Sequence, residues 1–106
     1  MKWNNPKTKQ LFQAILALKN LTEAKAFFRD LLTEVEIKEF SNRWLAVQML
    51  NAKVSYTIIQ KQTGLSSTTI ARISKWLQTG KGGYKLMLKR SGAHHHNSFS
   101  AGKGLY

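Results

Sequence analysis

The residues that most constrain the fold of this chain are 54–77, VSYTIIQKQTGLSSTTIARISKWL, which read as two short helices joined by a tight turn. Gly64 stands where the chain has to turn, because glycine takes the left-handed conformation that commonly ends a helix without a Cβ penalty. Leu65 is expected to fill the corner between the helices, and Ser66 to cap the second one. The pattern predicts a helix-turn-helix.

The second helix of this pair is predicted to have a buried face and an exposed face. Ile70, Ile73 and Leu77 recur at spacings of three and four residues, so we expect them to hold the helix against a core. The first helix is expected to be capped by Ser55 and to turn both Ile58 and Ile59 inward. On the second helix, the side chains that then point outward are Ser67, Thr68, Ala71, Arg72 and Lys75, with Thr69 at the border.

The outward side chains are short near the helix start and long further along. A helix that reads DNA approaches the base edges with its N-terminal residues, so short side chains suit that position. Hydroxyls can serve either base edge, and the methyl groups of Thr and Ala can contact thymine methyls. Arg72 can fork to a guanine or hold a phosphate. The alternative is a plain helical hairpin with a glycine turn.

The charge of the chain also favours a nucleic-acid partner. Lys and Arg number 17 and Asp and Glu number 5, a net charge of +12, and every acid lies between residues 23 and 39. Uncompensated positive charge repels itself, and binding to a polyanion relieves this repulsion while it releases counterions. An acidic membrane or protein surface and solubility alone are the alternatives. The residues predicted to contact phosphates are Lys61, Lys75, Lys81 and Lys85.

The rest of the chain predicts an all-α fold of about six helices. Helical periodicity indicates helices over residues 6–19, 23–32, 34–51 and 84–90, in addition to the two in 54–77. Asn5 and Thr22 are the expected caps of the first two, and Thr33 and Glu36 fit a capping box before the third. We predict one helical DNA-binding and dimerisation domain over 1–90 and a disordered tail over 91–106. Trp44 and Trp76 lie in amphipathic segments and are expected in the core.

The two amphipathic helices before residue 34 supply more apolar surface than a small helix-turn-helix needs. We expect this surplus to form a homodimer interface, with packing on the third helix as the alternative. No apolar run is long enough to cross a bilayer, and no cysteine is present, which fits a cytoplasmic protein. No set of residues fits catalysis or a structured metal site. The His94–His96 run lies in the predicted tail and is interpreted as a solvated segment.

The segment TGLSSTTIARI, preceded by EFSNRWLAVQML, resembles the Trp repressor superfamily, especially its YerC/YecD-like branch. The resemblance covers roughly residues 12–90. It implies an all-helical, intertwined homodimer that binds operator DNA through the second helix of the pair. By this match the base-facing positions are Ser67, Thr68, Thr69, Ala71 and Arg72.

The resemblance also bears on a small-molecule effector. In the tryptophan-binding members, two arginines sandwich the indole; Arg72 matches one of them, and Arg43 matches the other after a one-residue shift, which makes the pair a candidate effector pocket. A glycine follows the second-helix arginine in those members, whereas this chain has Ile73. A β-branched side chain there is expected to fill the space of the indole. We therefore predict no cofactor and no tryptophan binding, and the effector, if there is one, is unknown.

The combined prediction is a sequence-specific DNA-binding transcriptional regulator, a repressor and not an enzyme, that binds double-stranded DNA as a homodimer. The alternative is a nucleic-acid-binding or architectural protein without sequence preference, which shares the charge but does not need the short polar start of the second helix. A third hypothesis is the DNA-docking module of a recombinase or transposase, which would require a catalytic partner chain.

Overall fold

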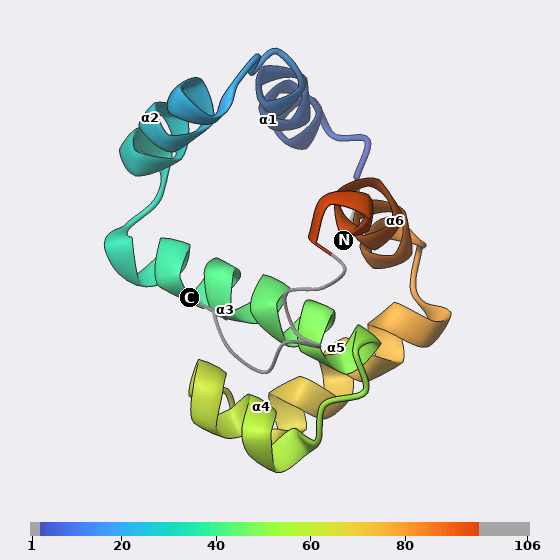
Figure 1. Ribbon diagram of the computed structural model, residues 1–106. Helices are drawn as coiled ribbons and strands as arrows, with labels where there is room; N and C mark the ends of the chain where they lie inside the picture. Colours follow the sequence, from blue (N-terminus) through green and yellow to red (C-terminus); the bar gives the residue numbers. More distant parts are fainter. Residues whose placement is uncertain (1–2, 96–106) are drawn as a thin grey trace. The chain divides into compact units, whose positions relative to one another are not determined.

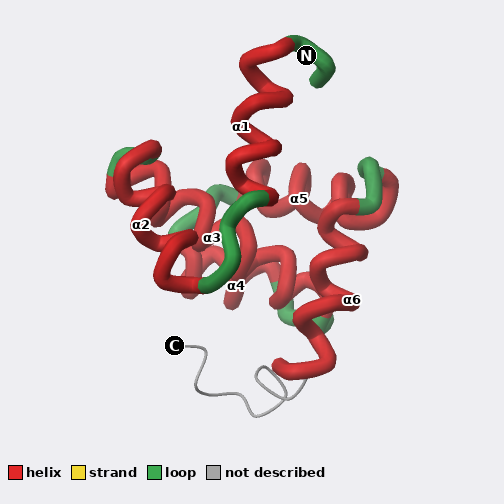
Figure 2. The backbone as a smooth tube through the Cα atoms, turned by 90° about the horizontal axis from the view of Figure 1, so that it is seen from above, coloured by secondary structure: helices red, strands yellow, loops and turns green. Residues whose placement is uncertain are grey.

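The computed structural model describes residues 3–95, and every regular element in that range is an α-helix (Figure 2). This confirms the predicted all-α class and its helix number. The chain forms two compact units, and the boundary between them along the sequence falls within the third helix, after Ile37 and before Lys38. The helices, in chain order (Figure 1), are α1 (Pro6–Leu16), α2 (Leu21–Leu31), α3 (Glu34–Asn51), α4 (Tyr56–Thr63), α5 (Ser67–Thr79) and α6 (Gly83–His95).

Asparagine residues cap both helices of the first unit. The Asn5 side chain accepts a hydrogen bond from the Thr8 N–H at 2.9 Å, as predicted. The Asn20 side chain accepts one from the Glu23 N–H at 2.9 Å, so α2 begins before Thr22. The prediction that Thr22 caps this helix was therefore wrong. Both residue types are good caps, and the earlier one forms the bond.

The first unit has no buried residue within its described part, residues 3–37. Leu16 is 84% exposed, Leu21 is 68% exposed and Val35 is 74% exposed. The aromatic pairs Trp3–Phe12 and Phe27–Phe28, with ring centroids 5.7 and 5.4 Å apart, are its closest ring contacts. Large apolar patches on a soluble protein mark interaction sites, so the exposed apolar side chains of this unit are candidates for an interface.

The start of α3 is fixed by the capping box that the sequence predicts. The Thr33 N–H donates to Glu36 Oε1 at 2.9 Å, and the Glu36 N–H donates to Thr33 Oγ1 at 3.1 Å. The hydrogen bonds from the backbone N–H and then the side chain of Thr33 favour the ionised carboxylate, and they hold the pKa of Glu36 below its ordinary value of 4.5.

Replacing Glu36 with glutamine should reduce the acid sensitivity of the fold. Because the folded pKa of Glu36 is lowered, its ionised form stabilises the fold above the ordinary pKa, and this contribution is lost as the pH falls through the folded value. Urea titrations at about pH 5 and about pH 3 should show a smaller loss of unfolding free energy in Glu36→Gln than in the parent. Glu34→Gln, which keeps the Thr33–Glu36 pair, is the control. An unchanged loss in Glu36→Gln would refute the prediction.

The second unit contains the hydrophobic core. Its buried side chains come from the C-terminal half of α3 and from α4 and α5, and Trp44 packs against this core with its ring centroid 6.5 Å from that of Tyr84. Both α4 and α6 contact α5, which therefore lies between them in the packing. The buried core residues are Ala46, Val47, Met49, Ile59, Ile70 and Ile73.

Helix α6, at the C-terminal end of the described chain, continues to His95, past the boundary expected at Arg90. The rest of the predicted tail lies outside the described residues, as do the side chains of the histidine run. None of the helices in residues 3–95 has the length and apolar character that crossing a membrane requires.

Candidate nucleic-acid interface

The turn between α4 and α5 is built as a helix-turn-helix. Gly64 ends α4 in the left-handed conformation, with φ at 73°, and its N–H donates to the Gln60 carbonyl at 2.8 Å. The buried Thr63 hydroxyl donates to the Ile59 carbonyl at 2.7 Å and accepts from the Leu65 N–H at 3.2 Å. These two hydrogen bonds of the Thr63 hydroxyl also stabilise the turn. They were not predicted, because a threonine at a helix end has no distinctive spacing.

Serine caps start both helices of the motif, as predicted. The Ile58 N–H donates to Ser55 Oγ at 3.4 Å, and the Thr69 N–H donates to Ser66 Oγ at 3.1 Å. Each cap satisfies one of the N–H groups that a helix start leaves without a partner. The residues at which α4 and α5 begin are therefore fixed by short-range bonds that the sequence encodes locally.

The orientation of α5 about its axis follows from its buried side chains. Ile70 is fully buried, Ile73 is 4% exposed, and the half-buried Leu77 packs against the same core, as predicted. On α4, Ile59 is fully buried but Ile58 is 48% exposed. The prediction that both isoleucines face inward was wrong, because successive residues of an α-helix point about 100° apart.

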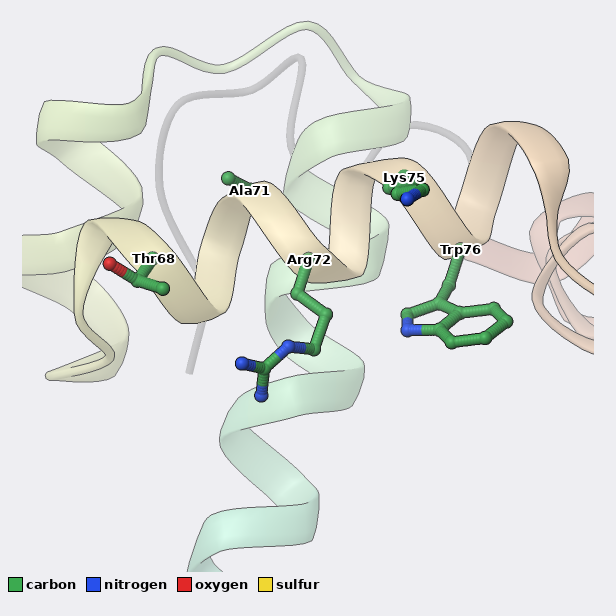
Figure 3. Close-up of a pocket in the computed structure, with 5 residues that line it drawn as sticks. All are labelled: Thr68, Ala71, Arg72, Lys75 and Trp76. Carbon is green, nitrogen blue, oxygen red and sulfur yellow. The ribbon is translucent and has the colours of Figure 1, made fainter. Parts of the chain in front are cut away.

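The outer face of α5 carries an open, mostly apolar groove with a volume of about 440 Å³. Its lining includes three of the five residues predicted to face bases. Arg72 and Trp76 project from the same side of the helix (Figure 3). The five lining residues are Thr68, Ala71, Arg72, Lys75 and Trp76, which repeat at helical spacing along one stripe.

The other two predicted base-facing residues lie at the start of α5. Ser67 is the first residue of the helix and is exposed. Thr69 is half-buried, and its hydroxyl accepts a hydrogen bond from Ser66 Oγ at 3.0 Å. The Thr69 hydroxyl is thus engaged in the N-cap, whereas the Ser67 and Thr68 hydroxyls have no such bond to the cap.

Trp76 is not in the core. Its side chain is 52% exposed, so the prediction that it is buried was wrong. The residue lies four positions after Arg72 and eight after Thr68, on the same outward stripe. This spacing is the signal that identifies its location, and it outweighs the general tendency of tryptophan toward burial. Trp44, by contrast, is partly buried against the core, as predicted.

The predicted phosphate-contacting lysines are all exposed, and they come from several elements. Lys61 lies on α4, Lys75 on α5, Lys81 in the turn that follows, and Lys85 on α6. The Lys85 ammonium donates to the Gln78 carbonyl at 3.4 Å, near the end of α5, where the helix dipole favours a cation. Among residues 3–91, whose side chains the structure describes, the only ion pair joins Arg43 to Glu39 at 2.8 Å. None of the four lysines therefore forms an ion pair with an acid in this part of the chain.

Of the two candidate effector residues, Arg72 lines the groove on α5 and Arg43 does not. Arg43 pairs with Glu39 and does not line the groove that contains Arg72. Ile73 belongs to the core and also lies outside this lining. Among residues 3–91, no group of three or more acidic or histidine side chains could hold a metal ion.

These features define the chain as an all-α helix-turn-helix protein with a basic surface. Comparison with known proteins gives the family. The family model described as Trp repressor protein matches residues 6–92. The chain is 40% identical over 81 residues to the uncharacterized protein YerC of Bacillus subtilis (strain 168). The aligned residues cover 76% of this chain and 78% of that protein. The chain belongs to the Trp repressor superfamily, in its YerC-like branch.

Two crystal structures have a similar fold. A TrpR-like protein from Eubacterium eligens ATCC 27750 superposes with a TM-score of 0.80 at 40% sequence identity, over 85% of this chain and 93% of that chain. A putative Trp repressor from Staphylococcus aureus gives a TM-score of 0.77 at 34% identity, over the same shares of both chains. The family is one of DNA-binding transcription regulators and not of enzymes.

Proposed function

We propose that the chain is a sequence-specific transcriptional repressor that binds operator DNA as an intertwined homodimer. The observation that carries this proposal is the outer face of α5. Thr68, Ala71 and Arg72 line it opposite the buried Ile70 and Ile73, with small side chains at the N-terminal end that enters the major groove. Phosphate contacts come from the exposed Lys61, Lys75, Lys81 and Lys85. The protein acts where its DNA lies, in the cytoplasm.

The first unit supports the homodimer. Its helices leave large apolar side chains in water, and none of its described residues is buried. A second copy of the chain that packs against α1 and α2 removes this surface from water, which stabilises the pair by about 25 cal/mol per Å² of apolar area. Two recognition helices in a dimer then read half-sites about 34–36 Å apart.

Replacing Arg72 with alanine should weaken binding to the preferred duplex by about 1–3 kcal/mol and relax the base preference at one position. The reason is that a guanidinium that forks to a base edge contributes to discrimination as well as to affinity. Site selection from a random duplex pool, followed by binding titrations, measures both quantities.

Lys89→Ala is the matched control for this variant, because it removes one exposed cation from α6 and leaves the recognition helix intact. Lys89→Ala should lower the affinity for every duplex by about the same factor, and this factor should be smaller than the loss in Arg72→Ala. The base preference should stay unchanged. An Arg72→Ala protein with the parent's affinity and preference would remove Arg72 from the interface.

The chain should not bind tryptophan. Ile73 is packed in the core beside the position of Arg72, and Arg43 is held by Glu39 outside the groove. Calorimetric titration of the protein with tryptophan should give only the heat of dilution, both with and without duplex DNA. Saturable binding at one tryptophan per chain would contradict this prediction.

A further inference from the structure

The exposed tryptophan on α5 is the one lining residue of the groove to which the proposed function gives no role. The Trp76 side chain is 52% exposed, and it lies on the same stripe as Arg72 and Lys75 (Figure 3). Its neighbours on that stripe are cationic, so a ligand of the whole stripe has to combine negative charge with apolar surface. An indole suits such a boundary, because it has an apolar body and a single N–H donor.

The distance along α5 locates Trp76 relative to DNA. An α-helix rises 1.5 Å per residue, which puts Trp76 about 12 Å along the axis from Thr68. The major groove is also about 12 Å wide. When the N-terminal residues of the helix contact base edges, as they do in this motif, the C-terminal half reaches the rim of the groove. The sugar-phosphate backbone forms that rim.

We propose that Trp76 is a DNA-positioning residue, whose indole packs on a deoxyribose at the groove rim while its Nε1–H donates to the adjoining phosphate. This inference rests on the proposed function, because it assumes that α5 enters the major groove. The deoxyribose presents C–H groups to the indole face, and Arg72 and Lys75 supply the charge that the phosphates attract. Backbone contacts of this kind fix the register of a protein on the duplex and carry no base preference.

The first arm of the test is a set of binding titrations with the full chain. Trp76→Ala should weaken binding about tenfold, to the selected duplex and to a random duplex alike, since the lost contact is apolar and not base-specific. Trp76→Phe should recover most of the loss. Because tryptophan carries no charge, the salt dependence should keep the parent's slope, whereas Lys75→Ala should reduce that slope by about 1.

A fluorescence measurement supplies the second arm. Trp3→Phe with Trp44→Phe leaves Trp76 as the only tryptophan of the three in the chain. Its emission should be that of a hydrated indole in the free protein. When duplex DNA is added, the emission should shift to shorter wavelength and become protected from quenching by iodide.

Gln78→Ala is the control for the binding titrations, because it changes an exposed residue of α5 outside the groove lining. It should bind DNA as the parent does.

The outcomes separate this inference from the proposed function. If Trp76→Ala binds DNA as the parent does while Arg72→Ala is weakened, the inference is wrong and the proposed function stands. Emission that is already blue-shifted without DNA, or a Trp76→Ala protein that loses its homodimer, would assign Trp76 to a protein interface and overturn the inference. If the parent does not bind duplex DNA, both proposals are wrong.

Discussion

Replacing Ile59 with alanine should lower the free energy of unfolding by about 2–5 kcal/mol, the range observed for truncating a buried aliphatic side chain. Ile59 is fully buried in the core that α3 and α5 also supply, and it is the most buried residue of α4. Its truncation loses the burial of the removed atoms and leaves a cavity that the neighbouring helices fill only in part. Because α4 supports α5 from one side, the same change should also lower DNA affinity.

The adjacent Ile58 is a closely matched control, since it has the same side chain and lies on the same helix. Its side chain is 48% exposed, so Ile58→Ala should cost less than about 1 kcal/mol. Urea unfolding at a fixed protein concentration measures both changes. Equal losses in the two variants would mean that α4 is rotated relative to the face seen here.

Introducing acidic groups on α1 should separate the homodimer and abolish tight DNA binding. Phe12→Asp with Leu16→Asp places two carboxylates on the apolar surface that the second copy is proposed to cover, and burying an unpaired charge costs several kcal/mol. The mass in light scattering should fall from two chains to one. Affinity for the selected duplex should fall by at least about a hundredfold, since each protomer then binds one half-site without the effective concentration of its partner.

Gln10→Asp with Gln13→Asp is the control for this variant, because it adds the same charge to exposed positions of the same helix. It should remain dimeric and keep most of the parent's affinity at physiological salt. A parent protein that binds DNA tightly while its mass is that of one chain would contradict the dimer prediction.

Local features of the fold were predictable from sequence because short-range bonds determine them. The Ser66 cap, the left-handed Gly64 and the Thr33–Glu36 box each depend on residues within a few positions of one another. The buried pair on α5 was predictable for a related reason. Ile70 and Ile73 are three residues apart and so lie on one face of the helix, and turning that face inward buries both.

The features that sequence did not predict depend on contacts between elements or on choices between similar residues. Thr22 and Asn20 are both competent caps, and the hydrogen bond to Glu23 decides between them. Ile58 and Ile59 are chemically identical, and the helix packing decides which is buried. Trp76 was misplaced because residue type was given more weight than its spacing from Arg72.

The candidate interface was partly predictable in the same sense. The outward stripe on α5 follows from the period of the helix, and it contains Thr68, Ala71 and Arg72 as expected. The engagement of the Thr69 hydroxyl with Ser66 was not foreseen, because a threonine at this position can serve either the cap or a ligand. The hydrogen bond from Lys85 on α6 to the Gln78 carbonyl on α5 was also not predicted.

The measurement that tests sequence-specific operator binding most directly is the ratio of two affinities at one salt concentration. One is for the duplex selected from a random pool, and the other is for random duplex of the same length. We predict a selected site with two symmetric half-sites about 10–10.5 base pairs apart and a ratio of at least about 10³. A ratio below about tenfold, with no symmetry in the selected sequences, would show that the chain binds nucleic acid through charge alone.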